Sequence, residues 1–355
     1  MEDIKEKEAQ HEIYECPGCG ANLKYLPEQE SLFCEYCQTT ISLKGEASKE
    51  ELDFLSNIDN VHDEWSTDAV VVACDNCGAK NVVSKKDITS TCPFCGSSAA
   101  IKKDELIGEK PNRVIPFKVG KEDVIKTYQK WIKKKFFVPS KVKKEIPNPL
   151  LNGVYIPSWT YDSNTLSTYK GRLGKRYTVT VGSGKNRRTE TRIRYFSISG
   201  VHATFLDDVL ICSGEKLKQD VLDKLTPYNT NDSYVYDERY LLGFMAEHYN
   251  LSLKDGWEKA KQKGKKIIER EILSKYHYDI VDYLKVNTTY DKIKYKYVIL
   301  PVWICHYVYN DKKFQFMING ETGKIVGKYP ISALKITFVV LLLIALIVAF
   351  IAYFG

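Results

Sequence analysis

The residues of this chain that are most capable of chemistry are its cysteines, which are grouped rather than scattered. Eight of the ten cysteines form four Cys-x-x-Cys pairs, and fourteen residues separate the inner cysteines of successive pairs in both halves. Thiolates at this spacing can occupy adjacent corners of a tetrahedron, the geometry that zinc prefers. The spacing therefore predicts two structural zinc sites, made by Cys16, Cys19, Cys34 and Cys37 and by Cys74, Cys77, Cys92 and Cys95.

Each predicted site is complete with four sulfur ligands, so it leaves no position for water or a substrate. Gly20, Gly78 and Gly96 follow the second cysteine of their pairs, where the turn around a metal typically requires a positive φ. Disulfides, a redox-active pair and an iron–sulfur cluster are the alternatives. Zinc is favoured because the N-terminus resembles no signal peptide, so we expect a reducing compartment.

The charges around the predicted sites bear on their partners. Nucleic-acid-binding ribbons usually present clustered lysine and arginine with exposed aromatic residues. Acidic residues surround both sites instead, namely Glu15, Glu28, Glu30 and Glu35 at the first and Asp75 and Asp87 at the second. We therefore expect contact with protein partners, and nucleic acid is the less favoured alternative.

The equal spacing indicates that a small zinc ribbon occurs twice, before a larger domain. Of the 355 residues, 44% are hydrophobic, which is enough to form a large core, and the net charge of +7 is too mild to require nucleic acid or lipid. We expect a disordered tail at 1–10, a first ribbon at 11–44, an acidic linker at 45–68, a second ribbon at 69–100, a domain at 101–330 and an anchor at 331–355.

The region 101–330 mixes two periodicities, which predicts an α+β domain with an antiparallel sheet. Apolar residues recur at helical spacing over 124–136, and Ser252 with Asp255 has the spacing of a capping box at the start of a second helix. The aromatic residues after Pro157 and Pro301 either line a groove or, as we favour, fill the core. Alternating patterns predict strands at 154–161, 176–181, 191–196 and 294–318, with turns at 182–184 and 319–323.

The C-terminal stretch Ile336–Phe354 contains nineteen residues without a charge, which is long enough for a helix to cross a bilayer core. A buried core helix is the alternative, but such helices are rarely apolar on every face. Lys324, Lys328 and Lys335 precede the stretch and no lysine or arginine follows it. The positive-inside rule therefore predicts a single-pass protein of the cell membrane, with the bulk of the chain on the cytoplasmic side.

Motifs for catalysis are incomplete in this sequence. The stretch 181–185 lacks the first glycine and the final Ser or Thr of a phosphate-binding loop. Cys305 lies next to His306, but adjacent residues of a strand point to opposite faces and cannot form a nucleophile–base pair. We expect Cys305 and Cys212 to be small buried hydrophobic residues. We therefore expect no enzymatic activity.

A basic cluster falls within the predicted hairpin at 182–194. In a membrane-bound domain this hairpin could contact anionic lipid headgroups. A solvated edge protected by charges is an equally favoured alternative. The cluster consists of Lys185, Arg187, Arg188, Arg192 and Arg194.

The order of these parts resembles a family of bacterial membrane-anchored proteins with TFIIB-type zinc ribbons, and most of all its YdjG-like branch in Gram-positive bacteria. The resemblance includes the Cys-Pro-x-Cys-Gly ribbons and the terminal helix, and it covers nearly the whole chain. Further matching stretches are 112–117, 153–159, 240–249, 300–303 and 319–324.

The resemblance implies a role near membrane-stress systems of the phage-shock type, with SPFH-domain scaffold proteins as partners. Members of the family are often labelled as helicase-related or primosomal, but this sequence lacks helicase phosphate loops. We therefore expect a membrane-anchored adaptor that recruits protein partners. The alternative is a membrane-tethered nucleic-acid binder that uses the ribbons and the basic hairpin.

Overall fold

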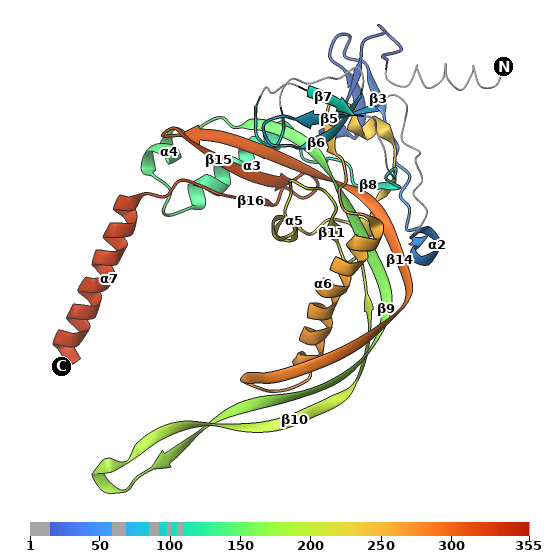
Figure 1. The fold of residues 1–355 in the computed structure, drawn as a ribbon. Coiled ribbons are helices and arrows are strands. Elements are labelled where there is room, and N and C mark those ends of the chain that lie inside the picture. The colour runs from blue at the N-terminus through green and yellow to red at the C-terminus, as the bar shows by residue number, and fades with distance from the viewer. Residues whose placement is uncertain (1–14, 59–68, 85–91, 98–100, 105–108, 355) are drawn as a thin grey trace.

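Two very long strands run through the computed structural model, which describes residues 15–58, 69–84, 92–97, 101–104 and 109–354. Strand β9 (Leu150–Val181) pairs antiparallel with β14 (Ile280–Tyr309), and β10 (Arg188–Leu206) pairs with the outer part of β9. Together they form the curved ribbon of strands that sweeps through Figure 1.

The curvature of this ribbon coincides with irregularities in the β9–β14 pairing. The register shifts between Val281 and Tyr283 and again between Asp291 and Lys294. Lys292, inside the second irregularity, has a φ of 51°. An extra residue on one strand bends that strand and increases its twist, so these two positions contribute to the bending.

The burial of residues changes along β9 and divides this strand into two parts. From 154 to 163 every residue is buried, whereas from 164 to 173 buried and exposed residues alternate. The first part is therefore covered on both faces, and the second part is covered on one face only. Trp159 and Trp303 are 0% and 1% exposed, which confirms that the aromatic residues after Pro157 and Pro301 fill the core.

Shorter strands complete a sheet that has thirteen strands among the described residues, in the order β12-β8-β14-β9-β13-β6-β5-β7 with five more attached to this path. Strands β5 (Ala69–Cys74), β6 (Lys80–Ser84) and β7 (Ile101–Asp104) form one end of this path. The additional strands of the main body are β4 (Leu52–Asp53), β8 (Arg113–Val114), β11 (Ile211–Cys212), β12 (Tyr234–Val235), β13 (Met245–Glu247), β15 (Lys312–Asn319) and β16 (Ile325–Gly327).

Helices cover parts of this sheet. The α-helices are α2 (Phe54–Asn57), α3 (Lys121–Lys134), α4 (Ser140–Lys144), α5 (Gln219–Leu225), α6 (Leu253–Ser274) and α7 (Ala333–Phe354). Short 3₁₀ turns occur at Pro27–Gln29, Gly184–Asn186, Thr230–Asp232 and Glu238–Leu241. The α+β class, the four-cysteine groups near the N-terminus and the apolar C-terminal helix are therefore as predicted.

Helix α6 lies along the inner side of the curved ribbon (Figure 1). Its N-cap is Ser252, whose hydroxyl oxygen accepts a hydrogen bond from the Asp255 N–H, which confirms the predicted start. Trp257 and Ile268 are buried in the core between the helix and the sheet, and the Trp257 ring lies 5.5 Å from the ring of Tyr161. Gly256 lets the helix approach closely, because a Cβ at this position would lie 2.3 Å from the Tyr161 hydroxyl oxygen.

One predicted strand was wrong. The segment 294–318 contains the end of β14 and most of β15, which are joined by a two-residue turn at Asn310 and Asp311. Both residues have positive φ values, 49° and 58°. Such turns favour Asn and Asp because these side chains tolerate the left-handed region, so the turn carried a sequence signal. The hairpin turn expected at 182–184 is present, but the flanking strands extend far beyond 176–196.

Residues 45–58 of the predicted linker pack on the main body. β4 pairs with β14, placing Asp53 opposite Lys294. Phe54 is 2% exposed and contacts the rings of Tyr161 and Trp257. The sparse apolar residues of this segment therefore attach it to the sheet, while the expected positions 59–68 and 1–10 lie outside the described residues.

The substitution Gly256→Ala tests the approach of α6 to the sheet. Alanine usually favours a helix over glycine by roughly 1 kcal/mol. Here we expect the opposite sign, a loss of about 1–3 kcal/mol in the free energy of unfolding, because the new methyl group overlaps the Tyr161 side chain. Urea unfolding of the detergent-solubilised protein measures this. The exposed Lys259→Ala on the same helix should stay near neutral, and a more stable Gly256→Ala protein would contradict the packing.

Candidate metal centres and the C-terminal helix

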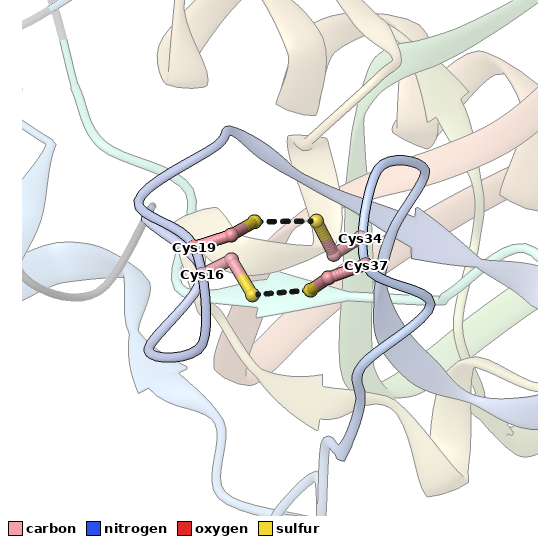
Figure 2. Close-up of side chains that lie close together, drawn as sticks. All are labelled: Cys16, Cys19, Cys34 and Cys37. Carbon is pink, nitrogen blue, oxygen red and sulfur yellow. Dashed lines mark hydrogen bonds between the residues drawn. The ribbon is translucent and has the colours of Figure 1, made fainter.

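The first four-cysteine group lies between two short loops (Figure 2). Cys16 and Cys19 precede β1 (Leu23–Leu26), Cys34 ends β2 (Ser31–Cys34), and Cys37 precedes β3 (Thr40–Ser42). These strands form a three-stranded antiparallel sheet. The sulfur atoms of Cys16 and Cys37 are 3.3 Å apart, and those of Cys19 and Cys34 are 3.5 Å apart.

The second group repeats this arrangement. Cys74 ends β5 (Ala69–Cys74), and the loop to β6 (Lys80–Ser84) carries Cys77. The Cys74 and Cys95 sulfur atoms are 3.8 Å apart, and those of Cys77 and Cys92 are 3.6 Å apart. The structure thus brings together the same two groups of four that the spacing predicted, with all sulfur atoms of a group within 4.8 Å of one another.

All four loops have the same backbone hydrogen bond. In each, the N–H of the residue after the second cysteine donates to the carbonyl of the first cysteine, at 2.7–2.9 Å. In three loops that residue is Gly20, Gly78 or Gly96, with φ near 70° as predicted. In the fourth it is Gln38, which has a φ of 63° and which the glycine pattern did not reveal.

The sulfur positions fit a tetrahedral metal ion. Four sulfurs about 2.3 Å from a central ion would be about 3.8 Å from each other, close to the distances observed here. They are too far apart for disulfides, in which the sulfurs are about 2.05 Å apart, and all eight cysteines are free. The two groups are therefore positioned to hold metal ions.

Hydrogen bonds from neighbouring side chains favour the thiolate form of two ligands. The Thr39 hydroxyl lies 3.1 Å from the Cys37 sulfur and lowers the pKa of Cys37 to about 6. Burial alone would raise the pKa of Cys95, but hydrogen bonds from Ser97 and Asn76 lower it to about 6. Thiolates are the form that binds metal.

Both groups are fixed to the main body. Tyr25 of β1 donates its hydroxyl hydrogen to the Phe117 carbonyl at 3.1 Å, and its N–H donates to the Leu242 carbonyl at 3.0 Å. Strand β6 pairs with β13, which itself pairs with β9. The second group therefore belongs to an extension of the large sheet, which strand β7 (Ile101–Asp104) continues by pairing with β5.

A third cluster consists of carboxylates and was missed in the sequence. Glu51, Asp162 and Asp208 come together where β4 meets the two long strands. The ammonium group of Lys296 lies 2.8 Å from Asp208 and 3.3 Å from Glu51, and Lys296 is only 2% exposed. A buried lysine therefore supplies the positive charge in this cluster, which we interpret as an internal ion-pair network.

Helix α7 leaves the body from the edge formed by α4 and β16 (Figure 1). Its span Ala333–Tyr353 has a mean hydropathy of 3.0, and no part of the most apolar window is buried in the protein. The predicted stretch Ile336–Phe354 lies within this helix. Among the described residues it is the one helix long and apolar enough to cross a membrane, and its exposure excludes the alternative of a core helix.

The basic hairpin and the two lone cysteines complete the predicted sites. Arg188 and Arg192 both form ion pairs with Glu190, at 2.8 and 3.3 Å, so part of the positive charge is balanced locally. Cys212 and Cys305 are buried, as predicted. Burial raises the pKa of the Cys305 thiol, which keeps it protonated.

These features define a class: an α+β protein with two four-cysteine groups positioned for metal and a C-terminal helix able to span a membrane. Over 329 residues the chain is 30% identical to YdjG of Bacillus subtilis (strain 168), an uncharacterized protein, and the match covers 91% of each chain. The chain therefore belongs to the same family as YdjG. No family model and no solved structure matches it.

The four-cysteine groups predict a defined metal content. We expect two metal ions per chain in the purified protein, and one in Cys34→Ser, because three sulfurs and a hydroxyl hold a soft metal poorly. Mass-spectrometric metal analysis with protein quantification measures the ratio. Cys305→Ala, which removes a buried cysteine outside both groups, should retain two ions. A wild-type protein free of metal would contradict the assignment.

The carboxylate cluster predicts a dependence of stability on pH. Burial, and next the hydrogen bond with Glu51, raise the pKa of Asp162 from 3.8 to about 8. Between these values the folded state keeps a proton that the unfolded state has lost, so stability falls as the pH rises, by at most about 1.4 kcal/mol per unit. Urea unfolding at several pH values measures the slope. Asp162→Asn, which keeps the oxygen that accepts from the Asp208 N–H, should flatten it. An identical slope in the two proteins would contradict the raised pKa.

Proposed function

We propose that this protein is a zinc-containing adaptor that is anchored in the cell membrane by α7 and recruits protein partners on the cytoplasmic side. One observation carries the proposal: both four-cysteine groups pack into one continuous body, and hydrogen bonds attach the first turn of the apolar helix to it. Such a body holds a partner at a fixed place relative to the membrane.

Zinc is the metal we propose for both sites. Four thiolates in a tetrahedral arrangement are typical of structural zinc, and they leave no open position for a substrate. A ribbon of this size has little core of its own, so metal binding would contribute directly to its folding. The same argument supports a role other than catalysis for the two sites.

The exposed tip of the first ribbon supports binding to protein. Tyr36 lies between Cys34 and Cys37 and is 81% exposed, and exposed aromatic residues of this kind often dominate protein interfaces. Beside it, Glu35 forms an ion pair of 2.6 Å with Lys24. Nucleic acid would require a cluster of unpaired positive charges, and the residues described around this tip do not form one.

The sidedness and the partners follow from further arguments. Lys324 and Lys328 precede α7 and Lys335 lies in its first turn, which favours a cytoplasmic body. The resemblance to membrane-anchored zinc-ribbon proteins implies SPFH-domain scaffold proteins of a membrane-stress system, so we propose these as the first partners to test.

A crosslinking pull-down of the full-length protein from bacterial membranes tests the adaptor function. We expect membrane scaffold proteins in the eluate, and we expect Tyr36→Ala to reduce their recovery about tenfold while metal content stays unchanged. The matched control is Leu55→Ala, which removes another largely exposed apolar side chain, on α2.

Two results would contradict this proposal. Equal partner recovery with Tyr36→Ala and wild type would exclude the first ribbon as the binding surface. Enriched RNA or DNA that is lost with rising salt and on neutralising Arg187 and Arg188 would favour the tethered nucleic-acid binder instead.

A further inference from the structure

The first turn of α7 is bound to the loop between α3 and α4. The Ser332 N–H donates to the Phe137 carbonyl at 2.8 Å, and the Lys335 ammonium donates to the carbonyls of Phe136 and Val138 at 3.1 and 2.7 Å. Figure 1 shows α4 beside the start of α7. We name residues 130–144, which include the end of α3, this loop and α4, the α3–α4 corner.

These contacts fix the depth of the α3–α4 corner if α7 spans a bilayer, as the proposed function requires. Lys335 is the last charged residue before the apolar stretch, so it marks the level at which the chain enters the hydrocarbon. Residues that touch Lys335 must then lie at the headgroup region. The hydrogen bonds to Lys335 therefore place the α3–α4 corner at the membrane surface.

Apolar side chains protrude at this same level. Phe136 is 60% exposed and Phe137 36%, although both are large aromatic residues. On the neighbouring chain segment Ile331 and Leu334 are 60% and 84% exposed. Such side chains gain contact with lipid when they enter the boundary between headgroups and acyl chains.

Two amphipathic aromatic residues lie beside them. The rings of Trp131 and Tyr329 are 5.5 Å apart, edge to face, and the Lys135 ammonium lies 5.2 and 5.5 Å from the two ring centres. Both aromatic residues are half-buried. Tryptophan, tyrosine and lysine are the residues that anchor proteins at the membrane–water interface.

The charge of the α3–α4 corner is of one sign. Residues 130–144 contain seven lysines and no aspartate or glutamate, and residues 324–335 add three lysines and again no acid. Clusters of lysine next to a transmembrane helix attract anionic lipid. Lys130, Lys133, Lys134, Lys141, Lys144 and Lys328 are exposed.

We propose that the α3–α4 corner is a docking surface for anionic phospholipid headgroups, into which Phe136 and Phe137 insert. This goes beyond anchoring by α7, because a second contact would fix how the body is oriented on the membrane. The corner is better suited to lipid than the basic hairpin at 182–194, where Glu190 pairs with Arg188 and Arg192.

A photo-crosslinking experiment tests the proposal. Benzoylphenylalanine replaces Phe136 in the full-length protein, which is reconstituted into vesicles of phosphatidylcholine alone or mixed with phosphatidylglycerol. We expect lipid crosslinks at position 136, with phosphatidylglycerol enriched at least about threefold over its share of the vesicle. The probe at Leu55, which is also exposed, is the control and should capture little lipid.

Matched charge variants test the lipid class. Neutralising Lys133, Lys134 and Lys144 to glutamine should abolish the enrichment. Neutralising three exposed lysines elsewhere, Lys44, Lys49 and Lys80, should leave it unchanged. Equal capture of both lipids by the wild type, or enrichment that survives the first variant, would overturn the preference for anionic headgroups.

Resistance to alkaline carbonate separates this proposal from the anchoring itself. Protein that resists extraction but yields no lipid crosslink at position 136 would overturn the docking surface and leave the anchor intact. Protein that is extracted would overturn the anchor, and the docking surface with it.

Discussion

The structure depends on the antiparallel pairing of β9 with β14. These two strands are far apart in sequence, yet they pair from Leu150 opposite His306 to Gly174 opposite Ile280. The other parts attach to this ladder: β13 and the second ribbon to β9, β4 to β14, and β15 with β16, which lead into α7, to the end of β14. The second ribbon and the strands that lead into α7 are therefore positioned relative to each other through this one sheet.

The two four-cysteine ribbons are attached to the large sheet in different ways. The first keeps its own three-stranded sheet and touches the body through side chains such as Tyr25, whose ring packs edge to face on Tyr240. The second continues the large sheet through backbone pairing of β6 with β13. Loss of metal at the second site would therefore disturb the edge of the main sheet, whereas loss at the first would disturb a packed but separate unit.

Features with local signals could be predicted from the sequence, and features that depend on distant partners could not. The cysteine groups, the cap at Ser252 and the terminal helix each depend on residues within a short window. In the part of β9 that is covered on one face only and just before it, the buried residues include Ser163, Thr165 and Ser167. The alternation of buried and exposed residues is therefore not an alternation of apolar and polar residues, and it gives little hydrophobic signal. The length of β9 is set by its pairing with strands that lie farther along the chain.

The carboxylate cluster shows the same limit at the level of single residues. Lys296 looks like one more scattered lysine in the sequence, and its acidic partners come from three distant segments. Pairing of β4 with β14 brings Glu51 to Lys296, and pairing of β9 with β14 brings Asp162 into the cluster. A spacing rule can identify ligands that share a loop, but it cannot identify charges that are brought together by the sheet.

The distribution of charge relates the orientation of the body on a membrane to the position of the first ribbon. Acidic residues gather around the first ribbon, whereas the segments beside the start of α7 carry lysines without acids. An anionic membrane surface would attract the second region and repel the first. Because the first ribbon packs on the body that carries the α3–α4 corner, attraction at the corner would also hold the ribbon tip away from the lipid. The exposed Tyr36 would then face away from the membrane, where a protein partner can reach it.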